Sequence, residues 1–418
     1  MNTTTRLMNK NFLLLWQGQL VSILGSQAGS IGMIFWIKHA TNSATLMGLM
    51  GTVSSLVGLL LAPIGGVFAD HYSRRAIIIW SDLFRGMVVL LFSVFLWVCP
   101  EETSFLVVLV FIGSMIHAMV LSFFGPAIQA SIPDLVPKEK LSKANALNTG
   151  SAQAVVLIGQ GMGGALFAWL GALLLFFIDG ITYLFAALSA CFIEIPQVRS
   201  TGKKNFKETL QAFKKDMKDG FFFIWQREGL RMFCLVMALL NFFSVPITLL
   251  LPFYIEDFLH LGPEWFGFVW ASFGGGALGG YALAGMVPLF GKMRQQVLIL
   301  LFLLQGVALS ALVFVFPPPY TLVLVGGIGV LNGFINVSNF TVVQQNIPSE
   351  MRGRVLGILG TFIGSITPLA MALSGIVADL TGQNIPLIYG VCGGSMFLVC
   401  LGISTNPPFR AFLSKTDY

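Results

Sequence analysis

The sequence has little charge for its size. Only 10% of its 418 residues are Asp, Glu, Lys or Arg, whereas 56% are hydrophobic and the mean hydropathy is +0.83. A soluble domain could not bury so much apolar surface, so the composition excludes an ordinary water-soluble protein. We therefore expect an integral membrane protein.

Cysteine is also scarce. The five cysteines are Cys99, Cys191, Cys234, Cys392 and Cys400. None has the spacing of a metal site, and a cysteine in an apolar segment usually packs as a small hydrophobic residue. We expect no disulfide, no metal and no cofactor. No nucleophile, base and orienting group can be grouped from the sequence either, so no enzyme is predicted.

The hydrophobic residues form twelve long continuous runs. A bilayer core of ~30 Å needs about 20 apolar residues per helix, whereas barrel strands would alternate apolar and polar residues. The predicted spans are 12–38, 44–69, 76–99, 105–127, 144–169, 173–195, 230–254, 265–289, 297–316, 321–342, 355–378 and 385–404. These runs predict an all-α integral membrane protein with twelve transmembrane helices.

Basic residues gather on one side of these spans. Most of the 24 Lys and Arg residues lie in the N-terminal tail, the even-numbered connections and the C-terminal tail. Connections rich in Lys and Arg stay in the cytoplasm, which places both termini there. Because this topology accounts for the net charge of +6, the charge gives no reason to expect a nucleic-acid partner.

The sequence also contains a long internal repeat. LVPKEKLSKANAL (135–147) aligns with NIPSEMRGRVLGI (346–358), which places Pro137 on Pro348 at a shift of 211 residues. Two copies of a six-helix unit with both termini on one side are typical of transporters whose halves form a parallel repeat. The repeat therefore predicts two related bundles.

These observations predict three parts of the chain. An N-terminal six-helix bundle is expected over 1–195 and a C-terminal one over 230–418, with a cytoplasmic basic linker, 196–229, between them. Within the linker, apolar and Lys residues alternate at helical spacing over 206–225. This stretch predicts an amphipathic helix that lies on the inner membrane face.

The turn between the second and third spans, GVFADHYSRR (66–75), is dense in charge. It resembles the signature loop of the major facilitator superfamily, G-x-x-x-D-R/K-x-G-R-R/K. The matching positions are Gly66, Asp70, Arg74 and Arg75. His71 stands where the family has a basic residue and Ser73 where it has glycine.

Two further stretches, GPAIQASIPDLVPKEKLSKANAL and IPSEMRGRVLGILG, are similar to the macrolide-efflux and enterobactin-exporter branch of this superfamily. The resemblance implies a monomeric secondary exporter of an amphipathic drug or siderophore in a bacterial inner membrane. It would work by alternating access, with protons as the coupling ion. A lipid or lysolipid flippase remains an alternative, and so does a membrane sensor or scaffold that transports nothing.

The resemblance gives Asp70 a role in gating. In the family this aspartate lies by the cytoplasmic start of helix 11, here near Arg354, and helps to hold the inner gate shut. The positive end of a helix dipole would favour such an anion. The second copy, GMVPLFGKMR (285–294), has Leu289 in place of Asp70, so only one half would carry this contact.

The two arginines of the turn are expected to form ion pairs. Glu139 and Glu350 are candidate partners for Arg74 and Arg75. The alternative is that these arginines only anchor the topology of the membrane protein.

The resemblance also indicates where the substrate binds, because helices 1, 4, 7 and 10 line the central path of the family. The candidate residues there are Gln19, Ser26, Gln27, Trp36, His117, Asn241, Phe242, Asn332, Asn336 and Asn339. Amides that face lipid are costly, so these side chains should face protein or water. Hydrogen bonding between helices is the alternative role for each of them.

Acidic residues are absent from those four predicted helices. If protons drive the protein, His117 is the titratable candidate on a cavity helix, with Asp82 and Asp179 as peripheral candidates. Asp82 and Arg85 stand three apart and are expected to form a structural or gating charge pair.

Glycine-rich stretches complete the pattern. GQGMGG (159–164) matches a dinucleotide-binding spacing, but it lies inside an apolar helix and follows no strand, which excludes that function. FGGGALGGYALAG (273–285) has the pairs Gly275/Gly279 and Gly276/Gly280. Both stretches predict close packing between helices.

Overall fold

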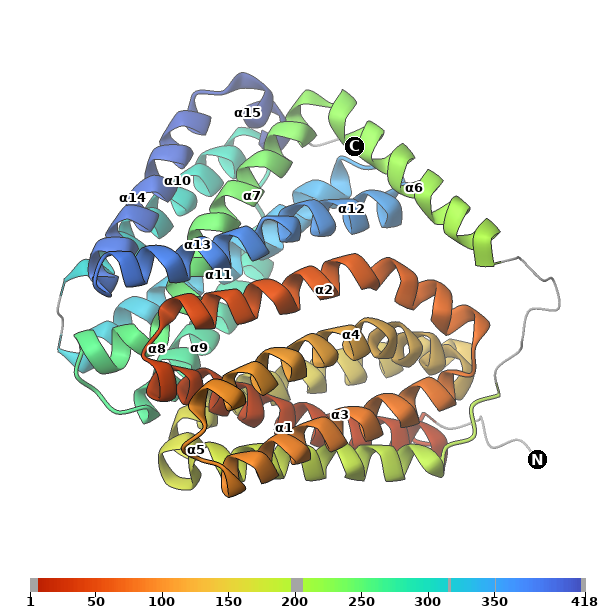
Figure 1. Cartoon of the computed structure of the whole chain (residues 1–418). Coiled ribbons are helices and arrows are strands. Elements are labelled where there is room, and N and C mark those ends of the chain that lie inside the picture. The colour runs from red at the N-terminus through yellow and green to blue at the C-terminus, as the bar shows by residue number, and fades with distance from the viewer. Residues whose placement is uncertain (1–6, 197–205, 315–316, 350, 415–418) are drawn as a thin grey trace. The chain divides into compact units, whose positions relative to one another are not determined.

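The computed structural model describes residues 7–196, 206–314, 317–349 and 351–414. Within these ranges every regular element is a helix. The chain groups into two compact units, Met1–Asn42 with Val53–Gln211 and Ser43–Thr52 with Ala212–Tyr418. Figure 1 draws the first unit mostly in red to yellow and the second mostly in green to blue.

The first unit is built on its longest helix, α5. Its helices are α1 (Lys10–Thr41), the greater part of α2 (Ala44–His71), α3 (Arg74–Val98), α4 (Thr103–Leu135) and α5 (Leu141–Cys191). The helix α5 packs along both α1 and α3. Close packing with α1 relies on glycine, because a Cβ on Gly159 would lie 2.5 Å from Cβ of Gln27. The prediction of close packing at 159–164 is therefore confirmed.

The helix α5 consists of two helices joined at a kink. Gly171 has φ 69°, a left-handed conformation that suits glycine because it has no Cβ. The predicted spans 144–169 and 173–195 fall on either side of this residue.

The second unit contains the greater part of α6 and the helices that follow it. They are α6 (Phe206–Gln226), α7 (Glu228–Leu249), α8 (Leu251–Phe253) with the π-helical turn Tyr254–Phe258, α9 (Glu264–Met286), α10 (Gly291–Ser310), α11 (Pro318–Gln345), α12 (Arg352–Ser365), α13 (Thr367–Leu380), α14 (Ile385–Ser404) and α15 (Pro407–Ser414). Within this unit α9 packs along α11, and α10 along α14. The predicted linker overlaps α6, whereas residues 197–205 lie outside the described residues.

Glycine again permits the closest contact, here between α9 and α11. A Cβ on Gly276 would lie 2.0 Å from the carbonyl oxygen of Gly326, and one on Gly280 would lie 2.2 Å from that of Val330. Gly275 and Gly279 have open space instead. One of the two predicted glycine pairs therefore makes the helix contact.

The first residues of α2 belong to the second unit because Asp379 caps them. Its carboxylate accepts hydrogen bonds from the Ser43 hydroxyl (2.8 Å) and from the backbone N–H groups of Ala44 (3.0 Å) and Thr45 (2.9 Å). The first N–H groups of a helix lack partners within the helix, so a carboxylate there is stabilising.

The described helices account for twelve crossings. Ten helical segments are long and apolar enough to span a bilayer, and one of them, Lys138–Cys191, contains both arms of α5. The helix α9 adds another crossing, although its glycines and tryptophans lower its hydropathy. The predicted all-α fold with two six-helix repeats is confirmed.

Candidate functional site

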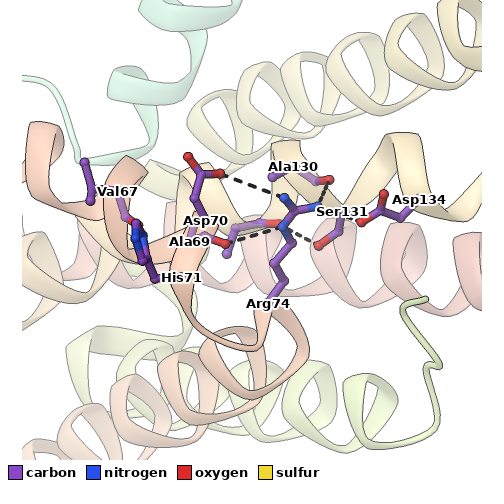
Figure 2. A network of polar contacts seen from close by, with 9 residues as sticks. Val67, Ala69, Asp70, His71, Arg74, Ala130, Ser131 and Asp134 are labelled. Carbon is purple, nitrogen blue, oxygen red and sulfur yellow. Dashed lines mark hydrogen bonds and ion pairs between the residues drawn. The ribbon is translucent and has the colours of Figure 1, made fainter. Parts of the chain in front are cut away.

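The charged turn between α2 and α3 is fastened to α4 by Arg74 (Figure 2). Its Nη1 donates to Oδ2 of Asp134 at 2.6 Å and to the carbonyl oxygen of Ala130 at 2.7 Å. Its Nε donates to the carbonyl oxygen of Ala69 at 3.4 Å, and Asp70 lies 3.9 Å away. Arg74 therefore joins the end of α2, the start of α3 and the last turn of α4.

The end of α4 is a favourable place for this guanidinium. The last carbonyl oxygens of a helix lack partners within the helix and form the negative end of its dipole, so a cation is stabilised there. The Arg74 side chain is 17% exposed and that of Asp134 is 25% exposed, so water and salt screen this ion pair in part.

Arg74 contacts an acid that the sequence analysis did not name, Asp134. Glu139 was one of the two expected partners of the arginines in this turn, and its pairing stays a prediction. The predicted fourth span stopped at residue 127, whereas α4 continues through Pro126 and Pro133 to Leu135. This extension places an acid on the last turn, within reach of Arg74. The other expected partner, Glu350, lies outside the described residues.

Arg75 and Ser73 of the turn make further hydrogen bonds. The Arg75 guanidinium donates to the carbonyl oxygen of Cys191. Ser73, which replaces the family's glycine, caps α3 by accepting a hydrogen bond from the N–H of Ala76. Asp70 is 63% exposed at its side chain, and its predicted position beside the start of the eleventh crossing stays a prediction.

A similar attachment occurs in the second unit. Nη1 of Arg294, in the first turn of α10, donates to Oε1 of Gln345 at 2.6 Å, and its Nε donates to the carbonyl oxygen of Leu413 at 2.8 Å. The repeat alignment places Asp134 on Gln345, since both belong to the shift of 211 residues. Each unit thus ties an arginine to the last turn of the equivalent helix.

The second unit also contains a cavity of about 420 Å³ lined by amides. Four of the predicted cavity residues line it: Asn241, Asn332, Asn336 and Asn339. Oδ1 of Asn332 accepts from Nδ2 of Asn336 at 2.8 Å, and Oδ1 of Asn241 accepts from the Thr367 hydroxyl at 3.0 Å. Oδ1 of Asn339 is buried without a hydrogen-bond partner in the described part of the chain.

The first unit contains a buried cluster of charge. Asp82 and Arg85, 1% and 4% exposed, form the predicted ion pair. The guanidinium lies 4.2 Å from the ring centre of Phe124 and 4.5 Å from that of Tyr183, as in cation–π contacts. It also interacts electrostatically with Asp179.

Each of the two acidic side chains near Arg85 has one carboxylate oxygen that accepts no hydrogen bond from the described residues. Oδ2 of Asp82 and Oδ1 of Asp179 are buried and have no hydrogen-bond partner among the described residues. Asp179 lies against α1, where a Cβ on Gly29 would come 2.4 Å from its Oδ2. Asp82 is thus paired directly with Arg85, whereas Asp179 lies within the electrostatic influence of the same arginine.

Comparison with known proteins gives the family. The family model described as Major Facilitator Superfamily matches residues 15–371. The chain belongs to the major facilitator superfamily. It is therefore a multi-pass membrane protein of a transporter family.

Similar proteins extend over nearly the whole transporter. Macrolide efflux protein A of Streptococcus pyogenes is 24% identical over 89% of this chain and 90% of its own length. The multidrug efflux pump Tap of Mycobacterium tuberculosis is 24% identical over 94% and 91%. These relatives agree with the drug-efflux branch that the sequence resembles.

Solved structures support the fold alone. The nucleoside transporter NupG has a TM-score of 0.70 at 11% identity and covers 96% of this chain and 99% of its own. A bacterial homologue of the iron transporter ferroportin, in an inward-facing state, has a TM-score of 0.68 at 17% identity and covers 95% and 98%.

The predicted cavity residues of the transporter's first unit make contacts between helices. Ser26 bonds the Tyr183 hydroxyl at 2.7 Å, and Gln27 packs against Gly159 as described above. The rings of Trp36 and Phe92 pack edge to face, with their centroids 5.6 Å apart. These contacts fit the structural role that the sequence left open, and the role of the three residues in substrate binding stays a prediction.

Three other candidates lie outside the described cavity linings. The His117 ring lies 6.3 Å from that of Tyr183, beside the charge cluster. Phe242 packs edge to face on Phe243 at 5.3 Å. Gln19 is half-buried on α1. Their role in binding stays a prediction.

The sequence analysis missed Gln305 of α10. It lines the amide cavity and is 8% exposed. Its signal was an amide within the apolar run LILLFLLQGVALS, where a polar residue is costly. It was overlooked because the search was confined to the four helices that the resemblance named.

Proposed function

We propose that this transporter is a secondary active exporter of an amphipathic small molecule, a drug or a siderophore, that works by alternating access. The observation that carries the proposal is the amide-lined cavity of the second unit. The names of the two efflux relatives support the same direction and substrate class.

The cavity suits an amphipathic and largely uncharged molecule. Its volume of about 420 Å³ falls within the range of small-molecule sites, about 300 to 1,000 Å³. Aromatic and aliphatic side chains such as Phe233 and Phe302 form most of its wall, and no charged residue is among the described lining. A few amides on apolar walls orient a ligand through hydrogen bonds while apolar contact supplies most of the binding energy.

We propose the buried charge cluster as the proton-coupling site. Asp82 and Asp179 are both buried near a single arginine, in a low-dielectric environment where two carboxylate charges are costly unless one is neutralised. Uptake and release of a proton would change the balance of charge around Arg85. His117 lies beside the same cluster and is the further candidate.

The charge distribution supports the topology in this proposal, and the family resemblance supports its other parts. We propose that the protein acts as a monomer in a bacterial inner membrane, with both termini and the basic stretch 196–229 on the cytoplasmic side. The bundles 1–195 and 230–418 would be the two halves that rock against each other. Asp70 would hold the inner gate through the start of the eleventh crossing.

Transport in liposomes tests this function. Purified protein is reconstituted, and uptake of a macrolide and of a catecholate siderophore is measured with and without a pH gradient. We expect transport of at least one of them to require the gradient. Asp179→Asn should abolish the dependence on the gradient, whereas Glu101→Gln, an exposed control, should not.

Other outcomes would contradict the proposal. Translocation of a fluorescent phospholipid in place of both compounds would indicate a flippase. The absence of both transport and substrate-stimulated proton flux, with correctly inserted protein, would indicate a sensor or scaffold.

A further inference from the structure

A second and smaller cavity lies within the second unit. Its volume is about 180 Å³, and α7, α9, α10, α11 and α14 all contribute to its wall. Four of its lining residues are aromatic: Tyr254, Trp270, Phe273 and Tyr389. It is therefore an aromatic pocket inside one six-helix bundle, beside the amide cavity described above.

The rings of this aromatic pocket already contact one another in pairs. Tyr254 and Tyr389 stack with centroids 4.9 Å apart, and Trp270 and Phe273 meet edge to face at 5.8 Å. Aromatic rings at such separations attract each other beyond simple burial. A further ring that entered the pocket would find both faces and edges to pack against.

The hydroxyl groups of the two tyrosines in the pocket already donate hydrogen bonds to the backbone. Tyr254 donates to the carbonyl oxygen of Leu312 at 2.9 Å, and Tyr389 donates to that of Ile247 at 2.7 Å. Both tyrosines thus turn their hydroxyls to the backbone. What they offer a ligand is ring surface.

Three residues line both the aromatic pocket and the amide cavity: Ser244, Gln305 and Asn332. The Ser244 hydroxyl donates to the carbonyl oxygen of Leu240 at 2.8 Å, and Asn332 accepts from Asn336. Gln305 is 8% exposed and lines both cavities, so its amide lies where a ligand that spans them would pass. An amide on a largely apolar wall can fix a ligand's orientation by hydrogen bonding.

We propose that the aromatic pocket is a subsite for one aryl group of the exported molecule. Gln305 would hydrogen-bond the polar group by which that ring is attached. A cavity of about 150 Å³ holds one benzene molecule, so 180 Å³ accommodates a single six-membered ring with a small substituent. The rest of the molecule occupies the amide cavity. This subsite rests on the proposed function for its physiological ligand but not for its binding chemistry.

Direct binding tests the subsite without any transport. Benzamide, a ring that carries an amide, is titrated into the purified full-length protein, and the dissociation constant is taken from the shift of the melting temperature. Acetamide, the same amide without a ring, is the control probe. We expect benzamide to stabilise the protein with saturation and acetamide to have no effect at equal concentration.

Two valines on α11 provide a matched pair of variants. Val325 lines the aromatic pocket and is 9% exposed, whereas Val323 is 74% exposed on the same helix. Val325→Phe fills the pocket and should weaken benzamide binding at least tenfold, whereas Val323→Phe should bind as the wild type does. Equal binding by the wild type and a folded Val325→Phe protein would overturn the subsite.

Gln305→Leu keeps the test decisive if Val325→Phe does not fold. The leucine preserves volume and removes the amide, so benzamide affinity should fall about tenfold while ethylbenzene affinity is retained or improved. Unchanged benzamide affinity would overturn the assignment of Gln305.

A transport assay then tests the subsite and the proposed exporter function independently of each other. A macrolide with an arylalkyl arm and its parent without the arm are compared in liposomes, and the arm should lower the KM in the wild type but not in Val325→Phe. Benzamide binding without transport of either macrolide would uphold the subsite and count against the exporter. Equal transport of both macrolides without benzamide binding would uphold the exporter and overturn the subsite.

Discussion

The two arginine attachments, one in each unit, differ in charge and in exposure. Arg74 contacts the carboxylates of Asp134 and Asp70 and is 17% exposed at its side chain. Arg294 is 3% exposed and contacts the neutral amide of Gln345 and a backbone carbonyl. Both hold the start of one helix to the end of another, but the side chain contacted at the end of α4 is a carboxylate, whereas the one at the end of α11 is a neutral amide.

This difference separates a structural contact from an adjustable one. A buried arginine held by an amide and a carbonyl oxygen cannot be released without leaving strong polar groups unpaired. An arginine between two partly exposed carboxylates can exchange one partner for water or for another cation at small cost. We therefore expect the second attachment to be permanent and the first to respond to salt and conformation.

The largest effect is expected from Arg294→Ala. It leaves Oε1 of Gln345 and the carbonyl oxygen of Leu413 without a charged donor, which should lower the free energy of unfolding by about 3 kcal/mol. Melting of the purified protein in detergent measures the loss. Lys292→Ala, an exposed basic residue two positions earlier, should change it by less than about 0.5 kcal/mol.

A smaller loss is expected from Arg74→Ala. The two hydrogen bonds to α4 contribute about 2 kcal/mol, because the partly exposed side chain is screened more than Arg294. Melting is measured at low and high salt, and the loss should shrink as salt rises. A loss at least as large as that of Arg294→Ala, and independent of salt, would refute the comparison.

Gln345→Glu should make the second attachment resemble the first. The carboxylate would lie opposite the buried Arg294 and should raise the free energy of unfolding by about 1 kcal/mol. The converse change, Asp134→Asn, should lower it by a similar amount. If both variants shift the melting temperature in the same direction, a carboxylate opposite the arginine does not have the same effect on stability in the two units.

The smallest effect on stability is expected from Asp70→Asn. Its side chain is exposed and lies 3.9 Å from Arg74, so the loss should stay below about 0.5 kcal/mol. Transport should nevertheless slow, because the proposed inner-gate contact is weakened and the inward-open population rises. Wild-type turnover by correctly inserted Asp70→Asn protein would remove this role.

The sequence predicted the helices well because long apolar runs leave few alternatives in a bilayer. It also predicted the amide-lined cavity in part. Asn332, Asn336 and Asn339 repeat at helical spacing, so one face of α11 had to be polar. Residues three or four apart lie on the same face of a helix whatever packs around it, so the sequence alone predicts a polar face.

Contacts between helices were harder to predict. The rotation of each helix about its axis is set by packing, so the sequence did not show that Ser26 points to Tyr183 or that Gln305 lies between two cavities. Asp134 was missed for a different reason. The predicted span ended with the apolar run at residue 127, whereas α4 continues past Pro133 to Leu135, because neighbouring helices in a membrane can accommodate a proline.

The kink at Gly171 has a consequence for how the chain is synthesised. Its left-handed residue joins the fifth and sixth crossings without a polar loop between them. Because no hydrophilic segment separates the two crossings, we expect them to enter the bilayer together as a helical hairpin. A residue with a Cβ at this position would cost about 1 to 2 kcal/mol in the finished protein and would also disfavour the turn during insertion.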